Sequence, residues 1–194
     1  LKVTKDNTFY TISGHDFTFV FNRRNGALQS WKKKNKEILV NPLEPYFLKP
    51  ANDNQIHNGY VQRLGVWKET AEQRQIRSSQ CLDKDGLVII IFDMTLPTVS
   101  SSYSLLYKIN SKGQIQVEAD YNPQGKEIAL IPKFGMRMRL CRDLDQITWY
   151  GRGDFENYPD RKTGAFLGIY SKKLKDFMTD YVFPQDNSNR CDVR

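Results

Sequence analysis

The stretch FTFVFNRRNGA, residues 17–27, sets the pattern for the fold of this chain. Phe17, Phe19 and Phe21 alternate with smaller or polar residues, and a period of two is typical of a β-strand with one buried face. The Asn25-Gly26 pair that follows tolerates the positive φ angles of a tight turn. The stretch therefore predicts a strand and a turn, after which ALQSWKKKNKEILV (27–40) predicts a return strand, a polar turn and a short third strand.

The same alternation recurs later in the chain. Segments of about strand length, separated by turn residues, are LVIIIFDMTL (87–96), SYSLLYKIN (102–110) and IQVEADYN (115–122). They pair most simply as antiparallel neighbours. In FGMRMRLC (134–141), Met136, Met138 and Leu140 fall on one face and polar residues on the other, which again predicts a strand with a wet side.

Helical spacing is weak. The best helical candidates, ETAEQRQI (69–76) and SKKLKDFM (171–178), are short enough to be an edge strand and a loop instead. Short strands joined by turns, without interleaved helices, predict an all-β antiparallel β-sandwich. No repeat or linker divides the chain, so one domain over 1–194 is expected. Residues 41–66 lack a clear strand and form a candidate functional or interface loop.

Charge and cysteine spacing argue against several classes of protein. The chain has 29 Lys+Arg against 22 Asp+Glu, a net charge of +7. Its densest basic cluster, residues 32–36, is interpreted as a hairpin end kept in water rather than a nucleic-acid site. Cys81, Cys141 and Cys191 lie too far apart for a zinc motif and are expected to be small buried thiols. No apolar run approaches the roughly 18 residues of a membrane span, and since residue 1 is Leu the chain is expected to be a soluble excised piece.

Two polar loops, residues 41–67 and 149–161, hold the side chains that a sugar site needs. Aromatic rings can stack on the C–H face of a sugar, while amides, carboxylates and guanidinium groups bond its hydroxyls. The plainer interpretation is that Asn52, Asp53 and Asn54 cap turns, and the sequence features alone favour it.

Catalysis by this chain alone is not expected. Asp154, Glu156 and Asp160 lie on one loop, whereas a retaining glycosidase needs two carboxyls about 5 to 5.5 Å apart, delivered by separate elements. Arg152 and Arg161 are close enough in sequence to neutralise these acids and to lock the loop by charge-assisted hydrogen bonds. Neither histidine lies in a recognisable nucleophile setting, so a Ser-His-Asp hydrolase has no support.

Three ordered blocks resemble one known family. WYGRGDFENYPDRKTGAF (149–166), followed by YVFPQDNSNRCDVR (181–194), resembles the W-x-G-x-G-x-x-E-x-Y-x-D-R and Y-x-x-P-Q-E motifs in the C-terminal region (small chain) of LacZ-type β-galactosidases, glycoside hydrolase family 2. PLEPYFLKPANDN (42–54) resembles that family's P-L-x-x-N-F-x-R-A-P-T-D-N-D loop. Residues 17–43 resemble its F-x-F-x-x-x-x-G-x-L-x-S opening.

The resemblance implies a galactose-mutarotase-like β-supersandwich, the last domain of a larger enzyme, beside a TIM barrel that carries both catalytic glutamates. No residue of this chain is therefore assigned a catalytic role. A loop that is mobile and close to the substrate cleft is implied at Gly151, Gly153, Glu156, Asn157, Tyr158, Pro159, Asp160 and Arg161. A candidate second loop comprises Pro50, Asn52, Asp53 and Asn54.

The sequence departs from the family pattern in the second loop. Leu48 and Lys49 stand where the family usually has Trp and Arg, and Gln55 stands where Asp is common, which weakens a binding role there. The chain is expected to represent the N-terminal two-thirds of the family domain, incomplete at its C-terminus. It is thus expected to lack the family's substrate-stacking tryptophan.

Two main hypotheses remain open. The first is a non-catalytic part of a β-galactosidase that hydrolyses terminal β-D-galactosides, supplying scaffold and cleft-rim loop. The alternative is an autonomous carbohydrate-binding module that presents Tyr158 or Trp67 to a sugar; a basic nucleic-acid module is a weaker third.

Cofactors and partners follow from the first hypothesis. No cofactor or metal is expected in this chain, and any Mg and Na or K ions of the parent enzyme would be bound by other domains. The expected partners are the galactoside substrate, reached through the parent enzyme, and the TIM barrel, with a homo-oligomer as a candidate assembly. Neither nucleic acid nor membrane is expected as a partner, and the location stays open between bacterial cytoplasm and periplasm.

Overall fold

The computed structural model describes residues 1–183 and 185–194, which form two compact units. Unit 1 comprises residues 1–48 and 62–141, and unit 2 comprises residues 49–61 and 142–194. Pro184, part of the second motif quoted above, lies outside the described residues. The expectation of a single domain over 1–194 stays a prediction.

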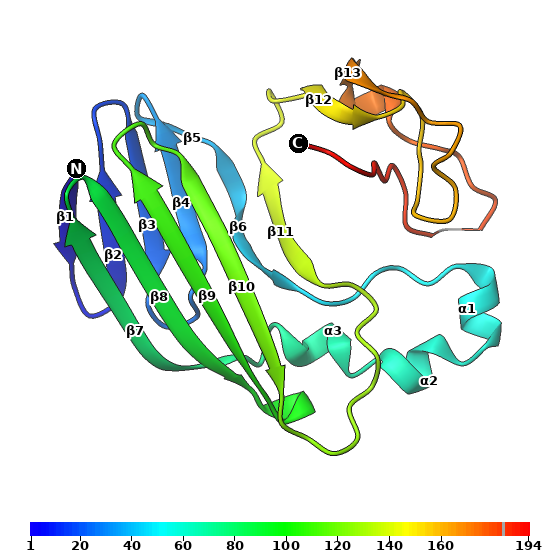
Figure 1. Ribbon diagram of the computed structural model, residues 1–194, viewed down its shortest axis with the longest axis horizontal. Helices are drawn as coiled ribbons and strands as arrows, with labels where there is room; N and C mark the ends of the chain where they lie inside the picture. The colour runs from blue at the N-terminus through cyan, green and yellow to red at the C-terminus, as the bar shows by residue number, and fades with distance from the viewer. Residues whose placement is uncertain (184) are drawn as a thin grey trace. The chain divides into compact units, whose positions relative to one another are not determined.

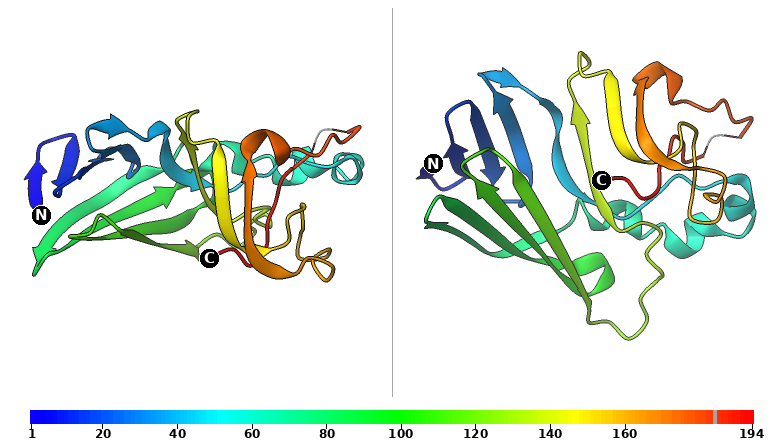
Figure 2. Two further views of the ribbon diagram at one scale, coloured as in Figure 1. Left: turned by 90° about the horizontal axis from the view of Figure 1, so that it is seen from above. Right: turned by 45° about the horizontal axis from the view of Figure 1, so that its top comes forward.

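Unit 1 is built from two antiparallel sheets (Figure 1, Figure 2). The first has the order β1-β2-β3-β4-β6-β11, with β5 paired to β4. Its strands are β1 (Lys2–Lys5), β2 (Phe9–Ser13), β3 (Phe17–Asn22), β4 (Leu28–Lys33), β5 (Lys36–Glu37), β6 (Leu39–Tyr46) and β11 (Gly135–Leu140). The second has the order β10-β9-β8-β7, with β7 (Gln75–Lys84), β8 (Leu87–Leu96), β9 (Ser101–Asn110) and β10 (Ile115–Pro123).

The inward side chains of both sheets form one hydrophobic core. Phe19 and Phe21 of β3 are fully buried, as the alternation in the sequence predicts. The ring of Phe21 contacts the ring of Tyr107 from β9, with centroids 4.8 Å apart, and Tyr10 contacts Phe92 at 6.2 Å. Burying each such side chain contributes roughly 1.5–3 kcal/mol. The prediction of an all-β antiparallel sandwich is confirmed.

The predicted turns of the first sheet are present. Gly26 has φ +70°, and a Cβ added there would lie 2.8 Å from Met94 Cε, so the Asn25-Gly26 turn requires glycine. Lys34 and Asn35 adopt positive φ angles between β4 and β5, at an exposed hairpin end. The basic cluster therefore lies in water, as expected.

The structure corrects one local prediction and decides two that the sequence left open between a helix and an edge strand or loop. Residues 41–66 begin inside β6, and they hold two short helices, α1 (Asp53–His57) and α2 (Tyr60–Leu64), rather than an irregular loop. In 69–76, α3 (Trp67–Thr70) ends and the edge strand β7 begins. Residues 171–178 hold no α-helix: a strand continues to Lys173 and is followed by the 3-10 turn η2 (Leu174–Asp176). Another 3-10 turn, η1, covers Pro97–Val99.

Strand β11 exists as predicted, but its alternation is interrupted. Register shifts occur between Arg137 and Arg139 and between Arg139 and Leu140, where β11 pairs with β6. At each shift the extra residue lies in β6, which advances by one residue more than β11. Met138 and Leu140 are 47% and 37% exposed rather than buried.

Unit 2 contains one two-stranded antiparallel sheet, β12 (Gln146–Arg152) and β13 (Leu167–Lys173). On one face, the ring of Trp149 lies 5.5 Å from the ring of Tyr170 and 5.3 Å from that of Phe177. The Arg190 guanidinium lies 5.3 Å from the centroid of the Trp149 ring, so the cluster joins the sheet to Phe177 and Arg190. Among the described residues, no helix of either unit is long and apolar enough to cross a membrane.

Candidate functional site

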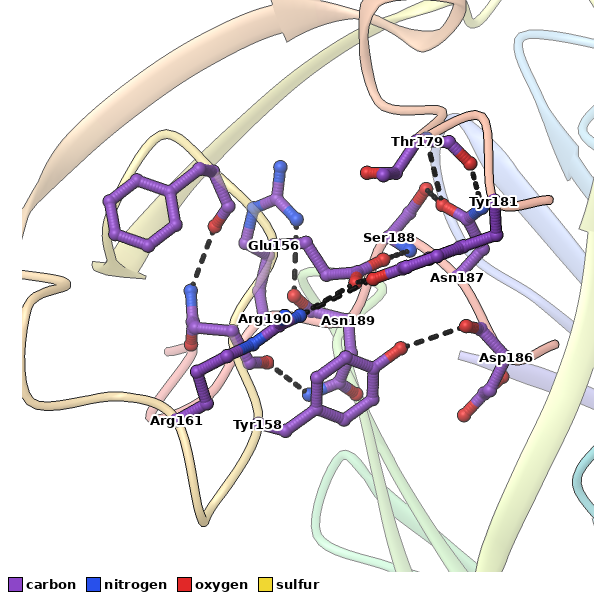
Figure 3. Close-up of polar contacts among 12 residues, drawn as sticks. Glu156, Tyr158, Arg161, Thr179, Tyr181, Asp186, Asn187, Ser188, Asn189 and Arg190 are labelled. Carbon is purple, nitrogen blue, oxygen red and sulfur yellow. Dashed lines mark hydrogen bonds and ion pairs between the residues drawn. The ribbon is translucent and has the colours of Figure 1, made fainter. Parts of the chain in front are cut away.

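Glu156 is the centre of the polar network in unit 2 (Figure 3). Its side chain is only 5% exposed. Oε1 accepts hydrogen bonds from Arg161 Nη2, at 3.0 Å, and from the Tyr181 hydroxyl, while Oε2 accepts from the Ser188 backbone N–H at 2.5 Å. Because its oxygens are engaged by three donors, Glu156 serves to join the loop to the C-terminal segment.

A tight turn follows Glu156. The Arg161 N–H donates to the Tyr158 carbonyl at 2.8 Å, which places Pro159 and Asp160 at the two central positions of the turn. The Arg161 guanidinium lies 5.7 Å from the centroid of the Tyr158 ring, and the Tyr158 hydroxyl donates to the Asp186 carbonyl at 3.0 Å. Burial, followed by the nearby Glu156 charge, raises the pKa of the Tyr158 phenol, so Tyr158 is a neutral donor.

Asn157 is fully buried and fully bonded. Its Nδ2 donates to the Phe155 carbonyl at 2.9 Å and to the Arg152 carbonyl at 3.3 Å, and its Oδ1 accepts from the Cys191 N–H at 2.9 Å. Asn157 therefore positions the loop and has no free polar atom to offer a ligand.

The two glycines have backbone roles. Gly153 has φ +37°, and a Cβ there would lie 3.0 Å from Ala165 Cβ. At Gly151, within β12, a Cβ would lie 3.1 Å from both the Trp149 ring and the Val193 backbone. Gly153 favours glycine because its φ is positive, whereas at Gly151 a larger residue would have to displace Trp149 and Val193 by a few tenths of an ångström.

The second predicted loop is organised by a capping box at the start of α1. Asn52 Oδ1 accepts from the Gln55 N–H at 2.8 Å, and Gln55 Oε1 accepts from the Asn52 N–H at 3.2 Å. Lys49 Nζ also donates to Gln55 Oε1, at 3.1 Å. The prediction that Asn52 caps a turn is confirmed, and its side-chain oxygen is accordingly bonded to the backbone.

Both predicted loops line one open pocket of about 400 Å³ in unit 2. Its walls combine cations, carboxylates, amides and tyrosines. The lining residues are Lys49, Pro50, Asn52, Gln55, Tyr158, Pro159, Asp160, Arg161, Tyr181, Gln185 and Asp186. Such a mixture can stack on an apolar face and bond a ring of hydroxyls.

The pocket separates the predicted residues into two groups. Pro50, Asn52 and the turn residues 158–161 line it. The buried supports Gly151, Gly153, Glu156 and Asn157, together with the exposed α1 residues Asp53 and Asn54, do not line it.

Two expectations about individual side chains were wrong. Arg152 does not neutralise an acid of its own loop: its Nε donates to Asp192 Oδ2 at 2.6 Å, which holds the pKa of Asp192 below its ordinary value. Asp154 instead faces Lys172 Nζ at 3.4 Å. Trp67 is 1% exposed in the core of unit 1, so it cannot present its ring to a sugar. The Arg161–Glu156 pair is present as predicted.

Sequence reasoning missed the C-terminal half of the site. Tyr181, Gln185 and Asp186 line the pocket, and Ser188 bonds Glu156. Sequence distance conceals these contacts, since Glu156 and Ser188 are 32 positions apart. The signal that pointed to these residues was the resemblance of the block 181–194 to the family motif.

Among the described residues, no group of three or more His, Cys, Asp or Glu side chains is placed to hold a metal ion. Cys81 is buried as expected, whereas Cys141 and Cys191 are partly exposed. The lining of the pocket offers hydrogen-bonding side chains and the rings of Tyr158 and Tyr181.

The comparisons with known proteins agree with this architecture. Residues 13–194 match the family model described as the β-galactosidase small chain. A β-galactosidase of Priestia megaterium is 30% identical over 194 residues, covering 100% of this chain and 19% of its own length. A β-galactosidase of Lactobacillus delbrueckii subsp. bulgaricus is 31% identical over 184 residues, covering 94% of this chain and 18% of its own length. The chain spans about a fifth of the length of these relatives. It belongs to the β-galactosidase small-chain family.

Proposed function

We propose that this chain forms part of the substrate-cleft wall of a β-galactosidase that hydrolyses terminal β-D-galactosides, without supplying the catalytic carboxylates. The observation that carries the proposal is the pocket of unit 2, where both motif-bearing loops of a β-galactosidase small chain meet. Relatives named β-galactosidases are about five times longer than the chain, which leaves room for a catalytic domain elsewhere.

The state of the carboxylates supports a non-catalytic role. Glu156 is buried, and its oxygens accept from Arg161, Tyr181 and Ser188. A general acid or nucleophile must reach the substrate, and a carboxylate occupied by three donors does not. Asp160, at the exposed turn, is the acid of this loop that lines the pocket.

The pocket suits a neutral, hydroxyl-rich ligand. Lys49 and Arg161 are balanced by Asp160 and Asp186, and Tyr158 and Tyr181 contribute ring surface. Balanced charges attract neither an anion nor a cation strongly, whereas alternating donors and acceptors match sugar hydroxyls. The chain thus contacts the sugar, or the group to which it is linked, at the rim of the cleft.

The test uses the full-length protein and a chromogenic β-galactoside. Asp160→Asn keeps the shape of the turn and removes one acceptor charge from the pocket, so kcat/KM is expected to fall several-fold. Asp176→Asn is the matched control, because Asp176 is an exposed acid of the same unit that does not line the pocket. Parental kcat and KM in both variants would contradict the cleft-wall role.

The isolated chain provides the second arm of the test. It is expected to show no turnover of the β-galactoside. Turnover that Glu156→Gln abolishes would overturn the non-catalytic assignment. Saturable galactose binding by the isolated chain, lost on Tyr158→Ala, would instead favour the autonomous carbohydrate-binding module.

A further inference from the structure

The sequence contains two Asn-Gly pairs, Asn25-Gly26 and Asn58-Gly59. Such a pair can modify itself, because the backbone nitrogen of the glycine can attack the side-chain carbonyl carbon of the asparagine and close a succinimide ring. Glycine favours the attack, since it has no side chain to obstruct it and its backbone rotates freely. The pair must still leave its folded geometry to react, so the surrounding structure decides which of the two pairs is modified.

The core of unit 1 holds the first pair in place. Gly26 is buried, and its carbonyl accepts a hydrogen bond from the Tyr107 hydroxyl at 3.1 Å. Asn25 Oδ1 accepts from the Ala27 N–H at 3.1 Å, and the Asn25 carbonyl accepts from Arg74 Nε at 2.7 Å. Ring closure at this pair would break these bonds and disturb the core, so the turn opens only when the sandwich itself unfolds.

The second pair lies at the exposed end of α1. Asn58 is exposed, and Gly59 has φ +71°. The Gly59 N–H donates to the Ile56 carbonyl at 3.0 Å, and the Asn58 N–H donates to the Asn54 carbonyl at 3.1 Å. Helix α1 has 5 residues, none of which is buried. So short a helix is marginally stable by itself, and its last turn can open without exposing apolar core.

We propose that Asn58 is a site of spontaneous deamidation, with water as the co-reactant, and that the fold protects Asn25 from the same reaction. When the last turn of α1 opens, the Gly59 nitrogen gives its proton to hydroxide and bonds to Asn58 Cγ. The Cγ–Nδ2 bond then breaks, and ammonia leaves with a proton from water. Water opens the succinimide at either of its carbonyl carbons, which yields aspartate or isoaspartate at position 58 with no change of oxidation state.

The product alters the segment that carries one side of the pocket in unit 2. It places a negative charge at the C-terminal end of α1, where the helix already presents carbonyl groups, so α1 is destabilised. Asn52 and Gln55, at the start of α1, line the pocket, and the Tyr60 hydroxyl donates to the Lys49 carbonyl at 2.9 Å. Deamidation of Asn58 therefore loosens this wall. The inference is independent of the cleft-wall role, because the modification is detected by mass.

Peptide mass spectrometry of the full-length protein, held in mildly alkaline buffer, measures the conversion of amide to acid at both pairs. In the native protein, conversion at Asn58 is expected to be at least about ten-fold faster than at Asn25, because the rate follows the fraction of time that each turn is open. In urea, where neither turn is folded, both residues are expected to react at similar rates. A native rate at Asn58 no faster than that at Asn25 would overturn the proposal, and so would a difference that persists in urea.

A pair of substitutions tests whether the opening of α1 controls the reaction. Asn52→Ala removes the cap whose Oδ1 accepts from the Gln55 N–H. It is expected to speed conversion at Asn58 roughly five-fold, the factor that corresponds to a cap worth about 1 kcal/mol. Asn54→Ala is the matched control, because Asn54 is exposed on the same helix and is not its cap, and alanine favours a helix. Equal rates of conversion in the two variants would overturn the role given to α1.

Discussion

Arg161 Nη2 lies 3.0 Å from Glu156 Oε1, and this ion pair joins an exposed side chain to a buried one. The guanidinium is 60% exposed while the carboxylate is 5% exposed. The hydrogen bond that the Arg161 guanidinium donates to the Tyr181 hydroxyl, together with the nearby Glu156 charge, raises the pKa of Arg161, so its guanidinium stays charged. Arg161 can therefore line the pocket and still fix the loop through Glu156.

Glu156→Gln is expected to destabilise unit 2. An amide has one acceptor oxygen, and its NH₂ must face at least one of the donors that now meet the carboxylate, so the free energy of unfolding should fall by about 1–3 kcal/mol. Calorimetry of the full-length protein measures the change. The control is Asp154→Asn, because Asp154 lies in the same loop and its side chain is 61% exposed. This variant should change the free energy of unfolding by less than about 1 kcal/mol. Lost turnover with unchanged melting would point instead to a catalytic Glu156.

Gly153→Ala is expected to cost about 1–3 kcal/mol, because φ is +37° and the new Cβ would meet Ala165 at 3.0 Å. Gly164→Ala provides the comparison in the same loop, since nothing lies within 4 Å of a Cβ there. That variant should be neutral or slightly stabilising. Thermal unfolding distinguishes the two, and equal melting temperatures would refute the backbone role of Gly153.

Arg74→Met is expected to destabilise unit 1 by roughly 3 kcal/mol. Arg74 is 7% exposed, its Nε donates to the Asn25 carbonyl at 2.7 Å, and its Nη2 lies 3.6 Å from Glu44 Oε2. Removing it leaves buried acceptors unbonded. Arg77→Met, at an exposed arginine three residues on, should stay within about 0.5 kcal/mol of the parent in urea unfolding. Similar losses of stability in Arg74→Met and Arg77→Met would show that the contacts of Arg74 contribute little to the stability of unit 1.

Glu37 should make stability depend on pH. Burial raises the pKa of Glu37, but the Ser30 hydroxyl and the backbone N–H groups of residues 31, 38 and 39 together outweigh it, so the pKa falls below its ordinary 4.5. The stabilisation is complete above that ordinary value and is lost as pH falls through the lower folded value. The free energy of unfolding of Glu37→Gln is accordingly expected to vary less with pH than that of the parent between neutral and acid conditions. A parallel pH profile for parent and variant would contradict this assignment.

The strands of unit 1 could be predicted because each is specified locally. Phe17, Phe19 and Phe21 alternate within six residues, and Asn25-Gly26 supplies a turn, so no distant contact is needed to recognise them. The register shifts between β6 and β11 and the aromatic cluster around Trp149 depend on partners far along the chain. Alternation alone could not reveal them.

The sequence by itself determined the β-rich class, the turn chemistry and the family, because period, glycine placement and motif order are properties of the linear chain. Only the tertiary structure decided which polar residues meet. It brought Tyr181 and Ser188 to Glu156, seated Lys49 and Asp160 in one pocket, and left Ile169 exposed. The physical reason is that hydrogen bonds and burial act over a few ångströms in space, and chain distance does not limit which residues they join.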